Sequence, residues 1–428
     1  MMDTMLDAKS ELDINSEIDD NKKQGIHEVL ILAISLGILQ AGFGIVTPIF
    51  PFYIQILGVG GLELGVLAAS FALTRITLAG PLGGLSDRIG RKPILVYGMM
   101  GFALANVVYA WAGNIIVMIG ARAVEGAVSA GFFPAANAYV SEVTSVENRG
   151  TGMGYLSMGN MVGFVIGPTT GGVLAQFLGY RVPFILAAYA TLIALLAVVK
   201  YVAEPNVDRQ RRFIAPNAPK QPKVKEILSN HPREYSVLAM AMFANMFAIG
   251  ILEVAFMLDA VVRYSISPLE IGIFFGVLGI ITIIGNIAFG KLSDKYGRKW
   301  LIVIGSAVGG ISLLLFIIMK DVTGFYIAGA VLGIAISMRG PTVQALIADL
   351  TEKSSYGVIM GVFGAISNGA YVIGPLLGGT LFDISGSGDS SLSIAAVVSF
   401  VMVVATAVGL PSGKVENKGE SEKVDEIL

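Results

Sequence analysis

Long apolar stretches fill most of the chain, and polar residues gather in the short intervals between them. An apolar run of about 20 residues is long enough for a helix to cross about 30 Å of hydrocarbon. Such runs predict about twelve membrane-spanning helices, near 28–57, 62–86, 93–112, 115–141, 151–176, 181–203, 235–262, 268–291, 299–319, 324–350, 355–383 and 392–411. The sequence therefore predicts an all-α polytopic membrane protein.

The second half of the chain repeats the first. Residues 83–92, Gly-Gly-Leu-Ser-Asp-Arg-Ile-Gly-Arg-Lys, recur as Gly-Lys-Leu-Ser-Asp-Lys-Tyr-Gly-Arg-Lys at 290–299, an offset of 290 − 83 = 207 residues. The same offset relates 163–172 to 370–379. A duplicated six-helix unit is common in secondary transporters and predicts two pseudo-symmetric halves. We expect a tail at 1–27, a first half at 28–203, a linker at 204–234, a second half at 235–411 and a tail at 412–428.

Composition agrees with a membrane protein and narrows its chemistry. Apolar residues make up 54% of the 428 residues and charged residues 14%, which is outside the range of soluble domains. The net charge of −2 gives no indication of a nucleic-acid partner. The chain has no cysteine, and both histidines lie outside the apolar runs, which excludes thiol catalysis, thiolate metal sites and an imidazole relay in the membrane. A buried proton carrier must then be a carboxylate, and we expect no enzyme activity, cofactor or metal.

Basic residues indicate how the chain is oriented. They crowd the loops at 87–92 and 291–299 and the linker, whereas the alternate loops hold only scattered ones. Because Lys and Arg favour the cytoplasmic side of a membrane, we expect both termini and the linker in the cytoplasm of a cell-membrane protein. The acidic N-terminal residues lack the features of a signal peptide and are interpreted as a solvated tail.

The two duplicated loops place acids and bases at helix ends. Glycine in each loop permits a tight reversal of the chain, and each aspartate can accept hydrogen bonds from the N-terminus of a neighbouring helix. The bases can pair with an acid at another helix end. Such a pair would form only when the halves approach on the cytoplasmic side, which would make it a gate latch; alternatively, the bases only hold the topology. The candidate gating residues are Asp87, Arg88, Gly90, Arg91, Lys92, Glu142, Asp294, Lys295, Gly297, Arg298, Lys299 and Asp349.

These motifs resemble those of the major facilitator superfamily, over about residues 28 to 411. Both loops fit its pattern G-x-L-(a)-D-r-x-G-r-k-x-x-l. Residues 41–51 are similar to the l-g-x5-P-v-x-P element of its twelve-span drug antiporters, and 122–126 are similar to R-x-x-q-G, with Glu125 in place of Gln. The fifth span fits the antiporter pattern g-x8-G-x3-G-P-x2-G-G at Gly154, Gly163, Gly167, Pro168, Gly171 and Gly172. The resemblance implies a twelve-span fold and drug:proton antiport.

The glycine-rich fifth span has a physical interpretation of its own. Gly159, Gly163 and Gly167 are spaced four residues apart and form a stripe along which another helix backbone can pack closely. Pro168 and its counterpart Pro375 remove a backbone N–H and predict a bend in each span. The stripe fits a pivot between the halves and ordinary small-residue packing equally well.

Six charged residues lie inside apolar runs, where each costs from about 3 kcal/mol upward. They are Arg75, Arg122, Glu125, Glu253, Asp259 and Arg339. Five of them fall on the fourth, seventh and tenth spans, which the resemblance implies line a central cavity. At 1.5 Å per residue, Arg122, Glu125 and Glu253 lie at comparable depths of roughly 10–15 Å and can meet. The candidate cavity residues are Arg122, Glu125, Glu253, Arg339, Gln40 and Asn245.

Each charged residue also has a structural interpretation. Arg122 and Glu125 are spaced i,i+3 and can neutralise each other, and Asp259 can pair with Arg263 four residues later. For Arg339, holding an anionic substrate and pairing with a carboxylate are both open. Gln40 and Asn245 can bind a substrate or join helices by hydrogen bonds.

The leading hypothesis is a proton-coupled exporter of small amphipathic or hydrophobic compounds, with Glu253 or Glu125 carrying the proton during alternating access. A facilitator or exporter of a specific metabolite, such as a sugar or organic anion, is the alternative. A non-transporting receptor or scaffold fits less well, because both copies of each motif are retained. The expected partners are a small-molecule substrate, protons and the lipid bilayer, and nothing in the sequence requires an oligomer.

Overall fold

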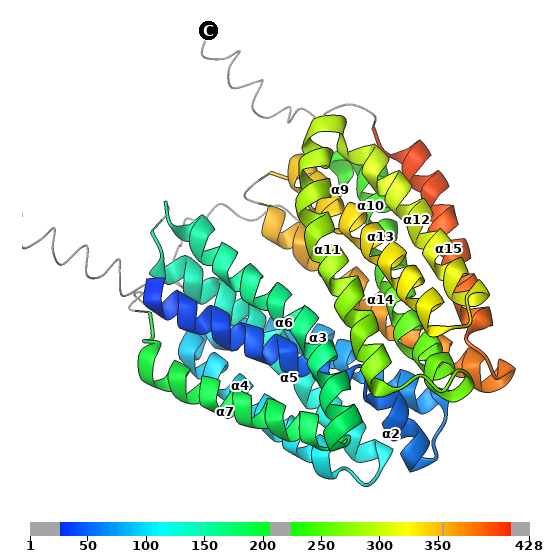
Figure 1. Ribbon diagram of the computed structural model, residues 1–428. Coiled ribbons are helices and arrows are strands. Elements are labelled where there is room, and N and C mark those ends of the chain that lie inside the picture. The colour runs from blue at the N-terminus through cyan, green and yellow to red at the C-terminus, as the bar shows by residue number, and fades with distance from the viewer. Residues whose placement is uncertain (1–25, 146, 206–223, 353–354, 412–428) are drawn as a thin grey trace, which may run out of the picture.

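The computed structural model describes residues 26–145, 147–205, 224–352 and 355–411 (Figure 1). Twelve helices in these residues are long and apolar enough to cross a membrane, which confirms the predicted fold class. They are Ile26–Val46, α3 (Gly61–Ile89), α4 (Arg91–Trp111), α5 (Ile115–Val143), α6 (Arg149–Leu178), α7 (Val182–Tyr201), α10 with its continuation (Pro232–Arg263), α11 (Pro268–Tyr296), α12 (Arg298–Ile318), α13 (Val322–Leu350), α14 (Tyr356–Ser385) and α15 (Asp389–Gly409). The expected tails and the middle of the linker lie outside the described residues.

Two spans differ in detail from the prediction. The first, predicted as one helix over 28–57, ends at Val46 and resumes after a turn as α2 (Phe50–Leu57). Pro48 and Pro51 explain the break, because neither has an N–H for the helical ladder. The seventh span begins as α10 (Pro232–Ile251) and continues through two π-helical turns, η1 (Leu252–Phe256) and η2 (Asp259–Arg263). A further short helix, α9 (Val224–Asn230), lies in the linker region.

The helices follow the sequence repeat closely. Gly61, Arg91, Ile115, Arg149 and Val182 begin α3 to α7, and the residues 207 positions later begin α11 to α15. The same local signals explain both sets: a glycine in the left-handed region, Gly90 or Gly297, ends one helix immediately before the next begins. The duplicated sequence thus forms two copies of one helical unit.

The two halves contact each other mainly through two pairs of helices, α3 with α14 and α6 with α11. We call the side of the molecule with the loops 87–92 and 291–299 the basic side, and the other end of the bundle the opposite side. Near the opposite side the crossing backbones touch: a methyl group at Gly61 would lie 2.7 Å from the Gly379 carbonyl oxygen, and one at Gly272 would lie 3.0 Å from the Thr169 oxygen. Glycines are what allow this approach.

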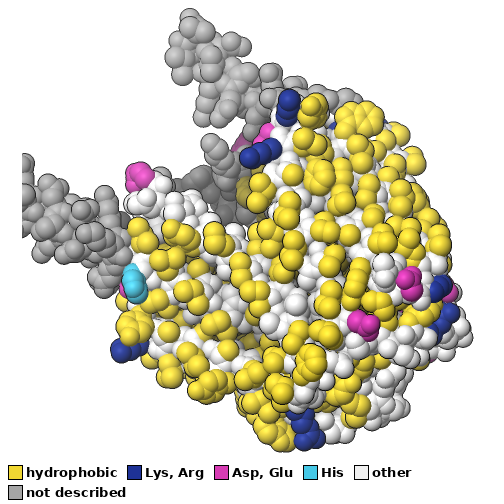
Figure 2. Space-filling view, in the orientation of Figure 1, with side chains coloured by type: hydrophobic (Ala, Val, Ile, Leu, Met, Phe, Trp, Pro, Cys, Tyr) yellow, Lys and Arg dark blue, Asp and Glu magenta, His cyan; other side chains and the backbone are white. Residues whose placement is uncertain are grey.

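Toward the basic side the halves diverge (Figure 1). A methyl group at Gly80 or Gly84 of α3, or at Gly154 of α6, would meet no atom within 4 Å. The space-filling view shows a notch between the halves at this side, and a face otherwise covered by hydrophobic side chains (Figure 2). The structure is therefore closed at the opposite side and open at the basic side.

Candidate functional site: a charge cluster between the halves

A group of buried charges joins the two halves near the closed side. Arg122 on α5 binds Glu125, one turn further along the same helix, with 2.8 Å between Nη1 and Oε2. Its Nη2 also lies 3.9 Å from Oε1 of Glu253, which η1 carries from the other half. The structure thus brings together the three residues that the sequence predicted to meet. One guanidinium is shared between two carboxylates on different halves.

Two tyrosines complete this charge cluster. Tyr109 of α4 donates a hydrogen bond of 3.0 Å to Oε2 of Glu125, and Tyr371 of α14 donates one to Oε2 of Glu253. Each carboxylate therefore has a hydroxyl donor from its own half and shares Arg122. Glu125 is fully buried, whereas the Glu253 side chain is 16% exposed.

Aromatic rings surround Arg122. Its guanidinium carbon lies 4.8 Å from the ring centre of Phe71 and 5.4 Å from that of Phe50, both within the range of cation–π attraction. Within the described residues, Nε of Arg122 and Oε1 of Glu125 have no hydrogen-bond partner. The cluster therefore keeps unused hydrogen-bonding capacity in an apolar environment.

The cluster has no equivalent in the other copy of the repeat. At the positions 207 residues away, each of its polar side chains is replaced by an apolar residue or glycine. These pairs are Tyr109 and Phe316, Arg122 and Gly329, Glu125 and Leu332, Glu253 and Val46, and Tyr371 and Phe164. Sequence reasoning missed both tyrosines, and this departure from the repeat is the signal by which they could have been found.

Arg339 lies elsewhere. Its side chain packs against Gly305 and Gly309 of α12, inside the second half, and is 5% exposed. Its repeat counterpart Phe132 packs in the same way beside Gly98. Arg339 makes no ion pair or hydrogen bond in the part of the chain that the structure describes, and its contacts are not with the charge cluster.

The two uncharged candidates also lie apart from the charge cluster's ion pairs. Gln40 is half-buried where the first span meets α6, beside Gly163. The side-chain oxygen of Asn245 on α10 is buried and accepts no hydrogen bond from the described residues.

The ion pairs of the duplicated loops form within each half. Arg91 lies 2.7 Å from Asp87 and 2.9 Å from Glu142, and Arg298 lies 2.8 Å from Asp349. They exist while the halves are apart on this side. The expectation that they form only when the halves approach there is wrong, because each pair joins neighbouring helices of one half.

The N-terminus of α4 has a cap that the sequence analysis did not identify. The N–H groups of Arg91 and Lys92 donate to the Glu204 carboxylate at 2.8 and 2.7 Å. We had expected an aspartate of the duplicated loops to fill a neighbouring helix N-terminus in this way. At α4, Glu204 occupies that role from the end of the first half.

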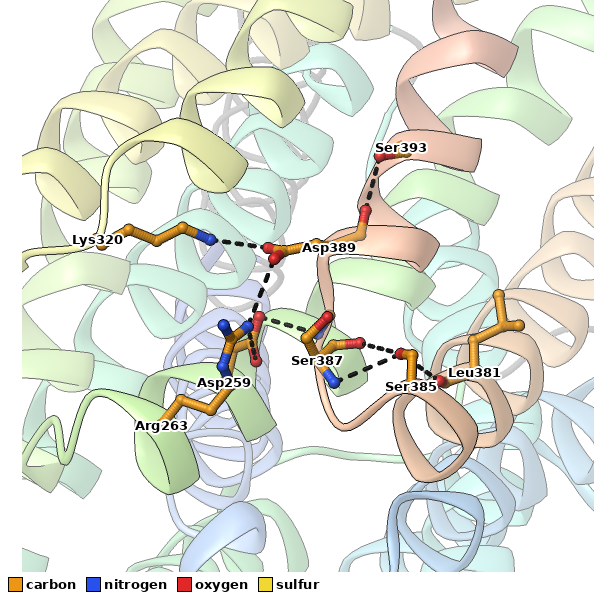
Figure 3. Close-up of polar contacts among 9 residues, drawn as sticks. Asp259, Arg263, Lys320, Leu381, Ser385, Ser387, Asp389 and Ser393 are labelled. Carbon is orange, nitrogen blue, oxygen red and sulfur yellow. Dashed lines mark hydrogen bonds and ion pairs between the residues drawn. The ribbon is translucent and has the colours of Figure 1, made fainter.

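A second charged group stabilises the opposite side of the second half (Figure 3). Asp259 pairs with Arg263 at 3.1 Å, which confirms that predicted pair, and accepts a hydrogen bond of 2.9 Å from the Gly388 N–H. Asp389 is contacted by Arg263 at 3.5 Å and by Lys320 at 2.9 Å. Burial alone would lower the pKa of Lys320, but the interactions with Asp389 and Tyr264 together outweigh burial and raise that pKa. This group ties three loops of one half together.

Comparison with known proteins identifies the family. The model of the Major Facilitator Superfamily matches residues 32–260 and 238–427. The chain belongs to the major facilitator superfamily. Its structure is similar to that of a bacterial homolog of the human lysosomal transporter Spinster in an inward-facing, occupied conformation, with a TM-score of 0.71, 17% identity and coverage of 91% of this chain and 95% of that one.

Two curated relatives have names that refer to drug resistance. Multidrug resistance protein 2 of Bacillus subtilis is 25% identical over 85% of this chain and 90% of its own length. Quinolone resistance protein NorA of Staphylococcus aureus is 24% identical over 88% of this chain and 95% of its own length. The protein is a multi-pass membrane transporter of this superfamily and not an enzyme.

The glycine motif of the fifth span packs mainly inside its own half. Side chains at Gly163, Gly167 and Gly171 would collide with the backbone of the first span, at residues 37, 41 and 45. Gly172 instead faces Pro268 and Gly272 of α11 in the other half. These three glycines thus pack against the first span, and the last glycine of the motif, Gly172, lies at the interface where the halves meet.

Proposed function

We propose that the protein is a proton-coupled exporter of small amphipathic or hydrophobic compounds. It works by alternating access in the cell membrane, with the basic side and both termini in the cytoplasm. The observation that carries this proposal is the charge cluster, in which a guanidinium of one half is shared with a carboxylate of the other. The relatives named for multidrug and quinolone resistance and the matched antiporter motif support the same function.

The positions of Arg122 and Glu253 support a direction for the proposed coupling. In the present state, open to the basic side, Arg122 lies near Glu253, and a positive charge at this distance favours the ionised acid. Opening toward the opposite side must separate the halves there, which removes Arg122 from Glu253. The acid, then facing outside water in an apolar wall, gains a proton. A proton is therefore taken up outside and released inside, as export driven by an inward proton gradient requires.

Glu253 is the carboxylate best placed to carry this proton. It is partly exposed, its partner arginine belongs to the other half, and the separation of 3.9 Å is long for an ion pair. Glu125 is fully buried and bound at 2.8 Å to an arginine on its own helix, so opening does not change that contact. Glu125 fixes the position of Arg122, and Tyr371 orients Glu253.

Aromatic side chains beside the charge cluster support an amphipathic substrate. Phe43 contacts Phe71, Phe102 and Phe133, with ring centres 4.5 to 6.1 Å apart. Phe43 and Phe102 are buried in the core of the first half, whereas Phe71 and Phe133 are partly exposed. These two rings offer apolar surface without fixed hydrogen-bond demands and suit ligands of varied shape. Between α6 and α11, a recess of about 160 Å³ lined by Asn160, Phe164 and Thr282, among others, adds both polar and apolar surface.

Transport in liposomes tests the proposal. Purified protein is reconstituted with an imposed pH gradient, and a panel of fluorescent dyes and antibiotics is scanned for uptake. We expect gradient-driven accumulation of at least one amphipathic compound, abolished by a protonophore. Equal rates with and without the gradient would instead identify a facilitator. Glu63→Gln, which changes a carboxylate outside the charge cluster, serves as the matched control for the cluster variants described below.

A further inference from the structure

The N-terminus of α3 is held by a carboxylate from the other half. Oδ1 of Asp383, near the end of α14, accepts a hydrogen bond of 2.6 Å from the Gly61 N–H, and Oδ2 accepts one of 2.8 Å from the Leu62 N–H. These are the first two N–H groups of α3, which have no acceptor within their own helix. Both oxygens of one ionised side chain are thus bound to a helix end whose dipole favours negative charge.

The contact lies where the halves must part when the opposite side opens. Gly61 and Gly379 touch through their backbones beside it, and Gly65 packs on Pro375. Opening this side must draw the N-terminus of α3 away from the end of α14. Both hydrogen bonds to Asp383 then break together, whereas the contacts at Gly61 and Gly65 are backbone packing.

The symmetry-related crossing lacks this arrangement. The counterpart of Asp383 is Gln176, and the counterpart of Gly61 is Pro268, which has no N–H to donate. At that crossing α11 is capped from within its own half, by Ser267 and Glu270. The carboxylate contact is therefore specific to the crossing of α3 with α14 and is not a general requirement of the fold.

We propose that Asp383 is a positioning residue of the transport cycle, latching the two halves at the opposite side and setting the balance between the two access states. The proposal rests on the alternating access of the proposed function. It requires neither proton coupling nor a particular substrate. The Asp383 carboxylate accepts one charge-assisted hydrogen bond on each oxygen, whereas asparagine is neutral and has an NH2 donor in place of the second oxygen. The latch should therefore be strongest with Asp, weaker with Asn and weakest with Ala.

Glu63 provides a matched control at the same helix end. Its carboxylate accepts a hydrogen bond of 3.0 Å from the Gly60 N–H, within the same half. Glu63→Gln therefore changes a cap of the same helix whose hydrogen bond is made within one half. If Asp383 is the latch, the balance between the access states changes in the Asp383 variants and stays unchanged in Glu63→Gln.

Distances between spin labels test the latch directly. The chain has no cysteine, so labels go only where cysteines are introduced. One pair, at Ile116 and Ile318, reports the opposite side; these side chains are 77% and 71% exposed. A second pair, at the exposed Lys200 and Lys291, reports the basic side. Distances are measured by pulsed electron paramagnetic resonance in detergent or lipid, after size-exclusion chromatography has shown that each variant is folded.

Asp383→Asn is expected to raise the ratio of opposite-side-open to basic-side-open molecules by about tenfold, and Asp383→Ala by more. The two label pairs should move in opposite directions, and Glu63→Gln should match the wild type. If wild type shows both states and the Asp383 variants do not shift them, the latch is wrong and alternating access stands. An equal shift in Glu63→Gln also overturns the latch. A single state in every protein contradicts both the latch and alternating access.

Discussion

At the scale of single residues, Arg122 interacts with two carboxylates, Glu125 and Glu253, at unequal distances. Arg122 and Glu125 belong to one helix and keep their 2.8 Å contact however the halves move. Glu253 belongs to the other half, and in the proposed cycle its 3.9 Å distance to Arg122 changes. A charge buried in apolar surroundings is costly unless paired, so the proposed mechanism makes the protonation of Glu253 and the position of the halves depend on each other.

The first prediction separates the two acids. Glu253→Gln mimics the permanently protonated acid, so gradient-driven export should fall to the level of protein-free liposomes while substrate binding is retained. Glu125→Gln keeps an acceptor for Tyr109 and Arg122 and should be milder. Dye transport and dye binding by fluorescence measure the two effects. Normal export by Glu253→Gln together with inactive Glu125→Gln would move the proton site to α5.

At the scale of elements, helix periodicity and the repeat predicted most of the fold. Each half's helices begin at the predicted offset because local signals, such as Gly90 and Gly297, were duplicated with them. The break after Val46 and the π turns at Glu253 were not predicted. An apolar run predicts a membrane span but does not show where the helical pitch changes locally. Tyr371 was missed for a different reason: its partner lies 118 residues away, so only tertiary structure reveals the pair.

The second prediction concerns the packing of α6. A side chain at Gly167 would collide with the carbonyl oxygen of Ala41, whereas one at Gly154 would meet open space. Gly167→Ala should therefore destabilise the protein by about 1–3 kcal/mol, the usual cost of overpacking. Gly154→Ala should be neutral or slightly stabilising, because alanine favours helix. Thermal unfolding, monitored by size-exclusion chromatography, compares the two variants. Equal melting temperatures would show that Gly167 has no special role in packing α6 against the first span.

The third prediction uses the difference between the duplicated loops. Asp87 pairs with Arg91, which in turn pairs with Glu142, whereas Asp294 makes no ion pair within the described residues. Asp87→Asn should slow transport by about fivefold, equivalent to ~1 kcal/mol in the barrier, and Asp294→Asn should have a smaller effect. Initial rates in liposomes, normalised to inserted protein, provide the measurement. A wild-type transport rate in Asp87→Asn, or a larger loss of rate in Asp294→Asn, would contradict a role of the Asp87 ion pair in transport.

At the scale of the whole molecule, two copies of one unit have diverged where they meet. The glycine crossings are kept on both sides of the pseudo-symmetry, at Gly172 and Gly379. The charge cluster and the Asp383 contact each lack a symmetry-related equivalent among the described residues. In the proposed mechanism, the symmetric crossings allow the movement between the two access states. The asymmetric groups couple that movement to a proton.

The most direct test follows the opposite-side distance, between labels at positions 116 and 318, as a function of pH. Acidification protonates Glu253, removes its attraction to Arg122 and should increase the open population in wild type. Glu253→Gln has no such acid, so it should favour the open state and respond little to pH, while Glu63→Gln should titrate like wild type. If Glu253→Gln kept the wild-type distances and the wild-type response to pH, the coupling of Glu253 protonation to alternating access would be wrong.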